Sequence, residues 1–255
     1  MLWTLAWQTA TGAAVTDQAA ALVADQTMPV DSGSNPLFPI PMYATAWWAG
    51  GATLTRVRIN APKFRGINRP QIRPIDSGVN PTGRPQLMEA WRRPLLYNAT
   101  EPIQPLQSDT ASETPNIVGI FGDLQRNAAQ GDMYTCRATT TLTPTANAWS
   151  AAPSLTFDDT LPTGRYEVQG MDEGSAGSVA ARLIFLGPAL PGVVPNVRPG
   201  GVFPVNLTSQ STRYFRYGYL GAWGQFINTA LPTLEVFKTA ATANPAVFLD
   251  IVKVG

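Results

Sequence analysis

The chain has 255 residues, of which only 14% are charged, and its formal net charge is +1. This balance excludes a global electrostatic attraction to nucleic acid or to an anionic membrane. The chain has no histidine and a single cysteine, Cys136, which excludes a Ser-His-Asp triad, an intrachain disulfide and a cysteine-based metal cluster. Because an average soluble domain is about 25% charged, we expect another subunit to cover part of the surface.

Proline (23 residues) and glycine (22 residues) punctuate the apolar segments along the whole chain. This pattern is typical of many short strands joined by turns, and it predicts an all-β protein. We predict an N-terminal arm over residues 1–27, a first β-sandwich over residues 28–130 and a second over residues 131–255. A single large sandwich is the alternative that this chain length also permits.

The first predicted elements are a short aromatic segment and one helix. Residues 2–7 (LWTLAW) have the character of a strand or of an anchoring arm. Residues 13–26 predict a short Ala-rich helix, because Val15, Ala19 and Leu22 would fall on one face. Both an internal packing helix and an arm that docks onto a neighbour fit this pattern.

The stretch from residue 51 to residue 96 has the largest charge imbalance. Nine of the 18 Lys and Arg residues lie between Arg56 and Arg93, against only Asp76 and Glu89. Alternation over residues 53–60 predicts a strand. Prolines at short intervals after Ile59 remove backbone donors, so we expect an extended basic ribbon there and no central strand.

The basic ribbon has two possible functions. Its arginines could contact nucleic acid phosphates or lipid head groups, or they could bridge to carboxylates and carbonyls of neighbouring segments or subunits. Nucleic-acid grooves usually combine such charges with aromatic stacking residues, which are scarce here. We therefore favour a subunit interface and do not expect nucleic-acid contact. The candidate interface residues are Arg56, Arg58, Arg65, Arg69, Arg73, Arg92 and Arg93.

The second half of the chain has cleaner strand patterns. Strands are predicted there over residues 133–142, 154–157, 165–171, 179–187, 213–219, 234–238 and 247–254, and at the end of the first half over residues 95–106 and 116–124. The carboxylate pairs Asp158-Asp159 and Asp172-Glu173 lie in Gly- or Pro-flanked segments, and we interpret both as turns and not as catalytic pairs. Cys136 is interpreted as a small buried residue.

Aromatic residues gather near residue 220. Tyr217, Tyr219 and Trp223 fit core packing, and the same residues could present rings to a sugar. The sequence alone leaves both interpretations open, with core packing favoured.

A charge-poor, Pro/Gly-punctuated β chain with extended segments and no catalytic groups resembles the smaller double jelly-roll major capsid proteins of membrane-containing bacteriophages. The resemblance rests on architecture and composition over most of the chain. It implies two eight-stranded jelly rolls and trimers with a pseudo-hexagonal outline. A single jelly roll with long insertions is the substitute if the first half lacks enough strands.

The function implied by this resemblance is that of a self-assembling major capsid protein, located in a virion that is assembled in the host cytoplasm. The expected partner is the chain itself, as a homo-oligomer, with a trimer expected inside a larger shell. Other virion proteins and an underlying membrane are further candidate partners. We expect no enzymatic activity, no cofactor and no metal. The alternative function is a carbohydrate- or receptor-binding β-sandwich module of a phage.

Overall fold

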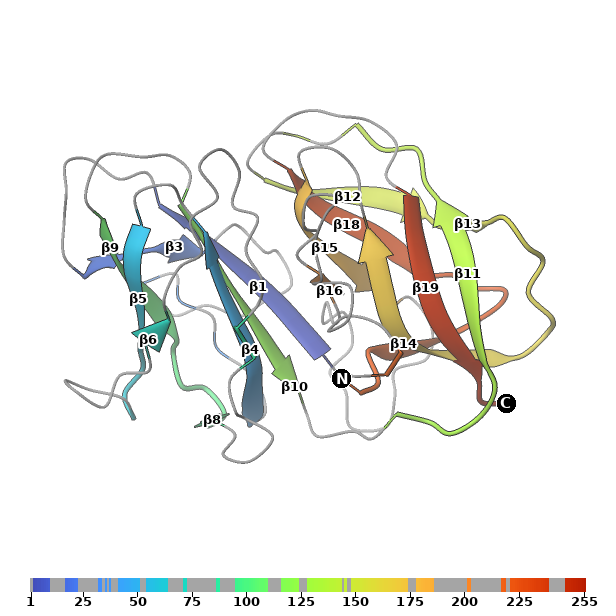
Figure 1. Ribbon diagram of the computed structural model, residues 1–255, viewed down its shortest axis with the longest axis horizontal. Coiled ribbons are helices and arrows are strands. Elements are labelled where there is room, and N and C mark those ends of the chain that lie inside the picture. Colours follow the sequence, from blue (N-terminus) through green and yellow to red (C-terminus); the bar gives the residue numbers. More distant parts are fainter. Residues whose placement is uncertain are drawn as a thin grey trace. The chain divides into compact units, whose positions relative to one another are not determined.

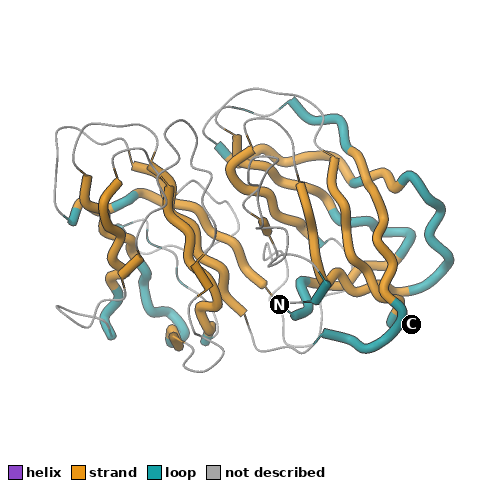
Figure 2. The backbone as a smooth tube through the Cα atoms, viewed as in Figure 1, coloured by secondary structure: helices purple, strands orange, loops and turns teal. Residues whose placement is uncertain are grey.

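The computed structural model describes residues 2–9, 17–22, 32–33, 35, 37, 41–50, 54–63, 71–72, 86–87, 95–109, 116–123, 128–143, 145, 148–173, 178–185, 201–202, 217–218, 221–238 and 246–255. These residues form strands, turns and loops and no helix (Figure 2), which confirms the all-β class. Accordingly, the described part of the chain has no helix with the length and hydropathy needed to cross a membrane.

The chain folds into two compact units, which we describe separately. The N-terminal unit contains Leu5–Gly122. The C-terminal unit contains Asp123–Gly255 together with Met1–Thr4.

The C-terminal unit has two sheets that face each other (Figure 1). The five-stranded sheet has the order β13-β11-β19-β14-β17, and the four-stranded sheet has the order β12-β18-β15-β16. The strands are β11 (Met133–Thr139), β12 (Trp149–Ser154), β13 (Thr156–Phe157), β14 (Arg165–Glu173), β15 (Ser178–Ile184), β16 (Gly201–Val202), β17 (Gly224–Ile227), β18 (Thr233–Lys238) and β19 (Ala246–Lys253).

The core of this unit follows from the period-two alternation of its strands. Val247, Leu249 and Ile251 on β19 are fully buried and face the core, whereas Phe248 on the other face is exposed. The alternation is not complete, because Asp250 and Val252 are buried as well. The two sheets approach closely at Gly224, because the ring of Phe185, next to β15, lies 2.5 Å from the point where a Cβ of residue 224 would stand. A larger residue at position 224 would therefore push the sheets apart.

The N-terminal unit also has two layers, with β5, β6 and β9 in one and β1, β4 and β10 in the other (Figure 1). Their orders are β2-β9-β5-β6 and β3-β1-β10-β4-β7, and β8 also pairs with β4. The strands are β1 (Leu2–Thr9), β2 (Gln18–Ala19), β3 (Ala21–Leu22), β4 (Met42–Gly50), β5 (Leu54–Asn60), β6 (Gln71–Ile72), β7 (Gln86–Leu87), β8 (Leu95–Tyr97), β9 (Gln104–Asp109) and β10 (Asn116–Asp123). The start of β1 and the last residue of β10 lie beyond the boundary of this unit.

Both units pair their strands in the same nested order. In the C-terminal unit β11 pairs with β19, β12 with β18, β14 with β17 and β15 with β16. In the N-terminal unit β1 pairs with β10, β2 with β9, β4 with β7 and β5 with β6. Each unit also adds a two-residue strand beside its first strand: β3 beside β1, and β13 beside β11. The two halves of the chain therefore share one topology.

The helix predicted over residues 13–26 is wrong at the described residues 17–22, which form β2 and β3. Gln18 pairs with Gln107 of β9, and Leu22 pairs with Trp7 of β1. Asp17 has a φ of 56°, which a right-handed helix does not allow. Hydrogen bonds to two distant strands thus outweigh the local helix propensity of the alanines.

Two further predictions need correction. The strand expected over residues 213–219 is wrong at Tyr217 and Gly218, which form a turn with φ values of 58° and 72°. The turn expected at Asp172-Glu173 is wrong because these residues end β14. The strand predictions at residues 116–124, 133–142, 165–171, 179–187, 234–238 and 247–254 are confirmed within one to three residues of their ends.

Candidate functional site

The described part of the basic ribbon begins on β5, where two arginines share one face of the strand. Val57 and Ile59 are fully buried, so Arg56 and Arg58, which alternate with them, point to the opposite face of the sheet. The Arg56 and Arg58 side chains are accordingly only partly covered, with 32% and 24% of their surface exposed. The alternation that makes β5 a strand therefore also places both guanidinium groups on the outer side of this sheet.

Both arginines meet the same carboxylate, Asp17, just before β2. Arg56 Nη2 lies 3.3 Å from Asp17 Oδ1, and Arg58 Nη1 lies 2.9 Å from Asp17 Oδ2. Ser108 of β9 joins them, because its Oγ accepts hydrogen bonds from the Asp17 N–H at 3.1 Å and from Arg56 Nη2 at 3.2 Å. We call Asp17, Arg56, Arg58 and Ser108 the arginine cluster.

The arginine cluster has more positive than negative charge. Two guanidinium groups face one carboxylate, which leaves a formal charge of +1. The Nε atoms of Arg56 and Arg58 are buried without a hydrogen-bond partner, although a guanidinium has five N–H donors to satisfy. The cluster therefore has fewer acceptors than donors, and its partly exposed arginine side chains suit a second oxyanion.

The other candidate interface arginines, Arg65, Arg69, Arg73, Arg92 and Arg93, lie outside the described residues. Within the ribbon the structure describes two short strands, β6 and β7, and each stands at the end of its strand order. Proline-rich segments are expected at such edges, because an edge strand loses little when a ladder donor is missing.

The aromatic candidates have different surroundings. Trp223 is fully buried, and its backbone N–H donates to the carbonyl of Val168 at 2.8 Å, so its ring belongs to the core. Tyr217 is 69% exposed, and Tyr219 lies outside the described residues. The structure therefore does not present Tyr217 and Trp223 as a joint surface.

A buried aspartate that sequence reasoning missed holds the Tyr217 turn. Asp250 of β19 is fully buried; its Oδ2 accepts from the Tyr217 N–H at 2.9 Å and its Oδ1 from the Thr135 hydroxyl at 2.8 Å. These bonds hold a bulky residue in the left-handed region, which such residues rarely adopt. The only sequence signal was one acidic residue inside the apolar run of residues 247–252.

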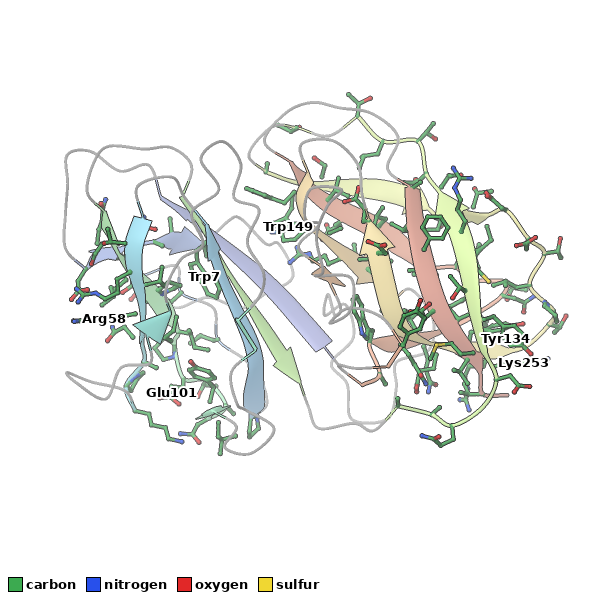
Figure 3. All side chains as sticks on the ribbon, in the orientation of Figure 1. Trp7, Arg58, Glu101, Tyr134, Trp149 and Lys253 are labelled. Atoms are coloured by element: carbon green, nitrogen blue, oxygen red, sulfur yellow. The ribbon has the colours of Figure 1, made fainter. Side chains whose placement is uncertain are left out.

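A buried ion pair on the four-stranded sheet of the C-terminal unit was also missed. Arg182 of β15 and Glu235 of β18 are cross-strand partners, and Arg182 Nε lies 2.7 Å from Glu235 Oε2. Their side chains are 0% and 2% exposed, and the Arg182 guanidinium stands 3.9 Å from the centre of the Trp149 ring (Figure 3 labels Trp149). The available signal was one arginine inside the apolar strand β15 and one glutamate between the apolar residues of β18.

Burial shifts the pKa of side chains in the described part of the chain. Burial, and then the nearby Asp159 carboxylate, raises the pKa of the Cys136 thiol. Burial, and then Glu101, raises the pKa of the Tyr97 hydroxyl well above its ordinary value. Glu101 itself accepts from the backbone N–H groups of Lys63 and Asn98 at 2.9 and 3.0 Å (Figure 3 labels Glu101). These groups stabilise loops and core.

No protein-family model, curated protein or solved structure matches this chain. In the described part of the chain, no three acidic or cysteine side chains come together as metal ligands would. Among the described residues, the arginine cluster is a surface where two guanidinium groups share one carboxylate.

Proposed function

We propose that each unit is a jelly roll and that the chain is a self-assembling shell protein of a virion. The observation that carries this proposal is the nested strand order that both units share. A jelly roll wraps two Greek keys onto two facing sheets. Its first strand then lies beside its last, its second beside its second-to-last, and the pairs alternate between the sheets.

The pairs in this chain alternate between sheets in that manner. In the C-terminal unit, β11–β19 and β14–β17 belong to one sheet, and β12–β18 and β15–β16 belong to the other. In the N-terminal unit, β1–β10 and β4–β7 belong to one sheet, and β2–β9 and β5–β6 belong to the other. This agreement supports a double jelly roll over a single jelly roll with long insertions.

The step from fold to function rests on composition and on the resemblance to double jelly-roll capsid proteins, because one fold hosts many functions. A charged fraction of only 14% supports a surface that is largely covered by neighbouring subunits. Two jelly rolls in one chain are also consistent with a shell, since each copy can then contact its neighbours through two β-sandwiches.

Light scattering and electron microscopy of the purified full chain test this proposal. The 27.3 kDa chain should form a defined oligomer, expected as a trimer, and the microscope should show rings, sheets or shells at higher concentration. A monodisperse monomer at micromolar concentration, with no higher assembly in the microscope, would contradict the proposal.

A carbohydrate- or receptor-binding module is the second candidate function, because jelly rolls also occur in lectins. The observation in its favour is Tyr217, which is largely exposed and held in a strained conformation by buried Asp250. A glycan array should then give hits that Tyr217→Ala removes, whereas the fully buried Trp223 should not contact ligand. An array without hits would remove this candidate.

A further inference from the structure

We propose that the arginine cluster of one copy binds the acidic turn of a second copy, with Asp159 as the entering carboxylate. The acidic turn consists of Asp158 and Asp159, directly after β13. This inference rests on the proposed function and adds to it a specific contact between copies.

The receiving side is the arginine cluster on the outer face of β5 in the N-terminal unit (Figure 3 labels Arg58). Its side chains are fixed before any partner arrives, because Asp17 and Ser108 already hold the arginines at 2.9 to 3.3 Å. A preformed donor group loses less side-chain entropy on binding than a free arginine does. Its remaining charge of +1 is the amount that one added carboxylate neutralises.

The entering side is the acidic turn at the edge of the C-terminal unit (Figure 2 shows its loop in teal). Both Asp158 and Asp159 are exposed. Asp158 is engaged within the chain, since its Oδ2 lies 2.6 Å from Arg137 Nη1 and its N–H donates to the Arg137 carbonyl at 3.1 Å. Asp158 therefore anchors the turn, and Asp159 is the carboxylate left for a partner.

Charge complementarity selects a second copy as the occupant. The described residues contain one pair of adjacent exposed carboxylates, at residues 158 and 159, and one surface where two arginines share a single carboxylate. The two surfaces belong to different units of the chain, and each copy has one of each. Such a contact either forms twice in a two-fold dimer or repeats head-to-tail from copy to copy, which closes a ring or extends an array.

Charge reversal on each side tests the contact in the full chain. Asp159→Lys and Arg58→Glu should each weaken assembly by at least about tenfold, measured as the concentration at which oligomers form, because each places like charges together. The double variant Arg58→Glu/Asp159→Lys should recover assembly, because its charges are again opposite. Asp132→Lys, at an exposed acidic residue outside both surfaces, is the matched control and should assemble like wild type.

The outcomes separate this inference from the proposed function. If wild type forms no oligomer, the proposed function fails and this contact fails with it. If wild type assembles and Asp159→Lys assembles equally well, only this contact is overturned. The same holds if the double variant assembles as poorly as the single variants although its circular dichroism and melting temperature remain native. If Arg58→Glu loses assembly while Asp159→Lys assembles normally, the arginine cluster binds another oxyanion, such as a phosphate. That result also overturns the proposed contact.

Discussion

The two units place arginine on strands with the same position in the strand order, β5 and β15, but they partner it differently. In the C-terminal unit, Arg182 faces one carboxylate, Glu235, and both side chains are almost completely buried. In the N-terminal unit, Arg56 and Arg58 share Asp17 and remain partly exposed. The Arg182–Glu235 pair, which we call the closed pair, has a balanced charge, whereas the arginine cluster, which we call the open cluster, has an excess positive charge.

Strands at the same position of one topology can therefore hold an arginine either inside a buried ion pair or in a partly exposed cluster. A buried ion pair pays a large desolvation penalty on folding and is stable only when its geometry and remaining hydrogen bonds are good. Once formed, it offers nothing to a partner, because no surface is left to contact. The open cluster contributes less to stability, since exposed pairs are screened by water and salt, and one of its two positive charges is not balanced by Asp17.

The largest expected effect comes from breaking the closed pair. Glu235→Ala leaves the Arg182 charge without its buried carboxylate, which should lower the free energy of unfolding by about 3–5 kcal/mol. Urea unfolding of the full chain at fixed protein concentration measures the loss, and hydrogen exchange should report it first at β15 and β18. The double variant Arg182→Met/Glu235→Leu removes both charges and should recover most of the stability. A loss below about 1 kcal/mol for Glu235→Ala would mean that the pair behaves like a surface ion pair.

The fold class could be read from the sequence because strand alternation is a local signal. Residues 133–142 and 247–254 carry that alternation on their own, and both form strands. β2 and β3 could not be read in this way, because two-residue strands exist only through partners such as Gln107, far along the chain. For the same reason, an alanine-rich segment suggested a helix that the structure does not contain at residues 17–22.

The sequence predicted the arginines of the candidate site but not their carboxylate partner. The arginines of β5 stood out by their number, but Asp17 lies 39 and 41 residues before them, and no local pattern connects them. Arg182 and Glu235 are 53 residues apart and meet only because β15 and β18 pair in that register. Partners of charged residues in a β protein depend on strand order, which periodicity does not reveal.

A second effect, of intermediate size, concerns Tyr97, a fully buried residue of the N-terminal unit. Its folded-state pKa lies well above the ordinary value of 10.0, chiefly through burial. The contribution of neutral Tyr97 to the free energy of unfolding is therefore complete below pH 10. It is lost as the pH rises further, because the tyrosine hydroxyl of the unfolded chain releases its proton first.

Hydrogen exchange between pH 8 and pH 11 should then show β8 and β9 opening before β15 and β18, after correction for the intrinsic exchange rate. Tyr97→Phe removes the ionisable hydroxyl and should abolish this alkaline sensitivity. Equal alkaline loosening of both units, or persistence of the sensitivity in Tyr97→Phe, would contradict the assignment.

The smallest expected effect separates charge from backbone strain at Asp17 in the open cluster. Asp17→Asn keeps a side chain that tolerates a φ of 56° but removes the carboxylate charge, and it should lower the free energy of unfolding by about 1 kcal/mol. Asp17→Ala also removes the charge and should lose roughly a further 1 kcal/mol, because alanine is strained in the left-handed region. Asp17→Gly relieves that strain, so its free energy of unfolding should be close to that of Asp17→Asn.

Urea unfolding in low and high salt measures these differences, with Asp132→Asn as the exposed control. If Asp17→Asn proved as damaging as Glu235→Ala, the open cluster would be a structural ion pair like the closed one, and the contrast between the two units would disappear.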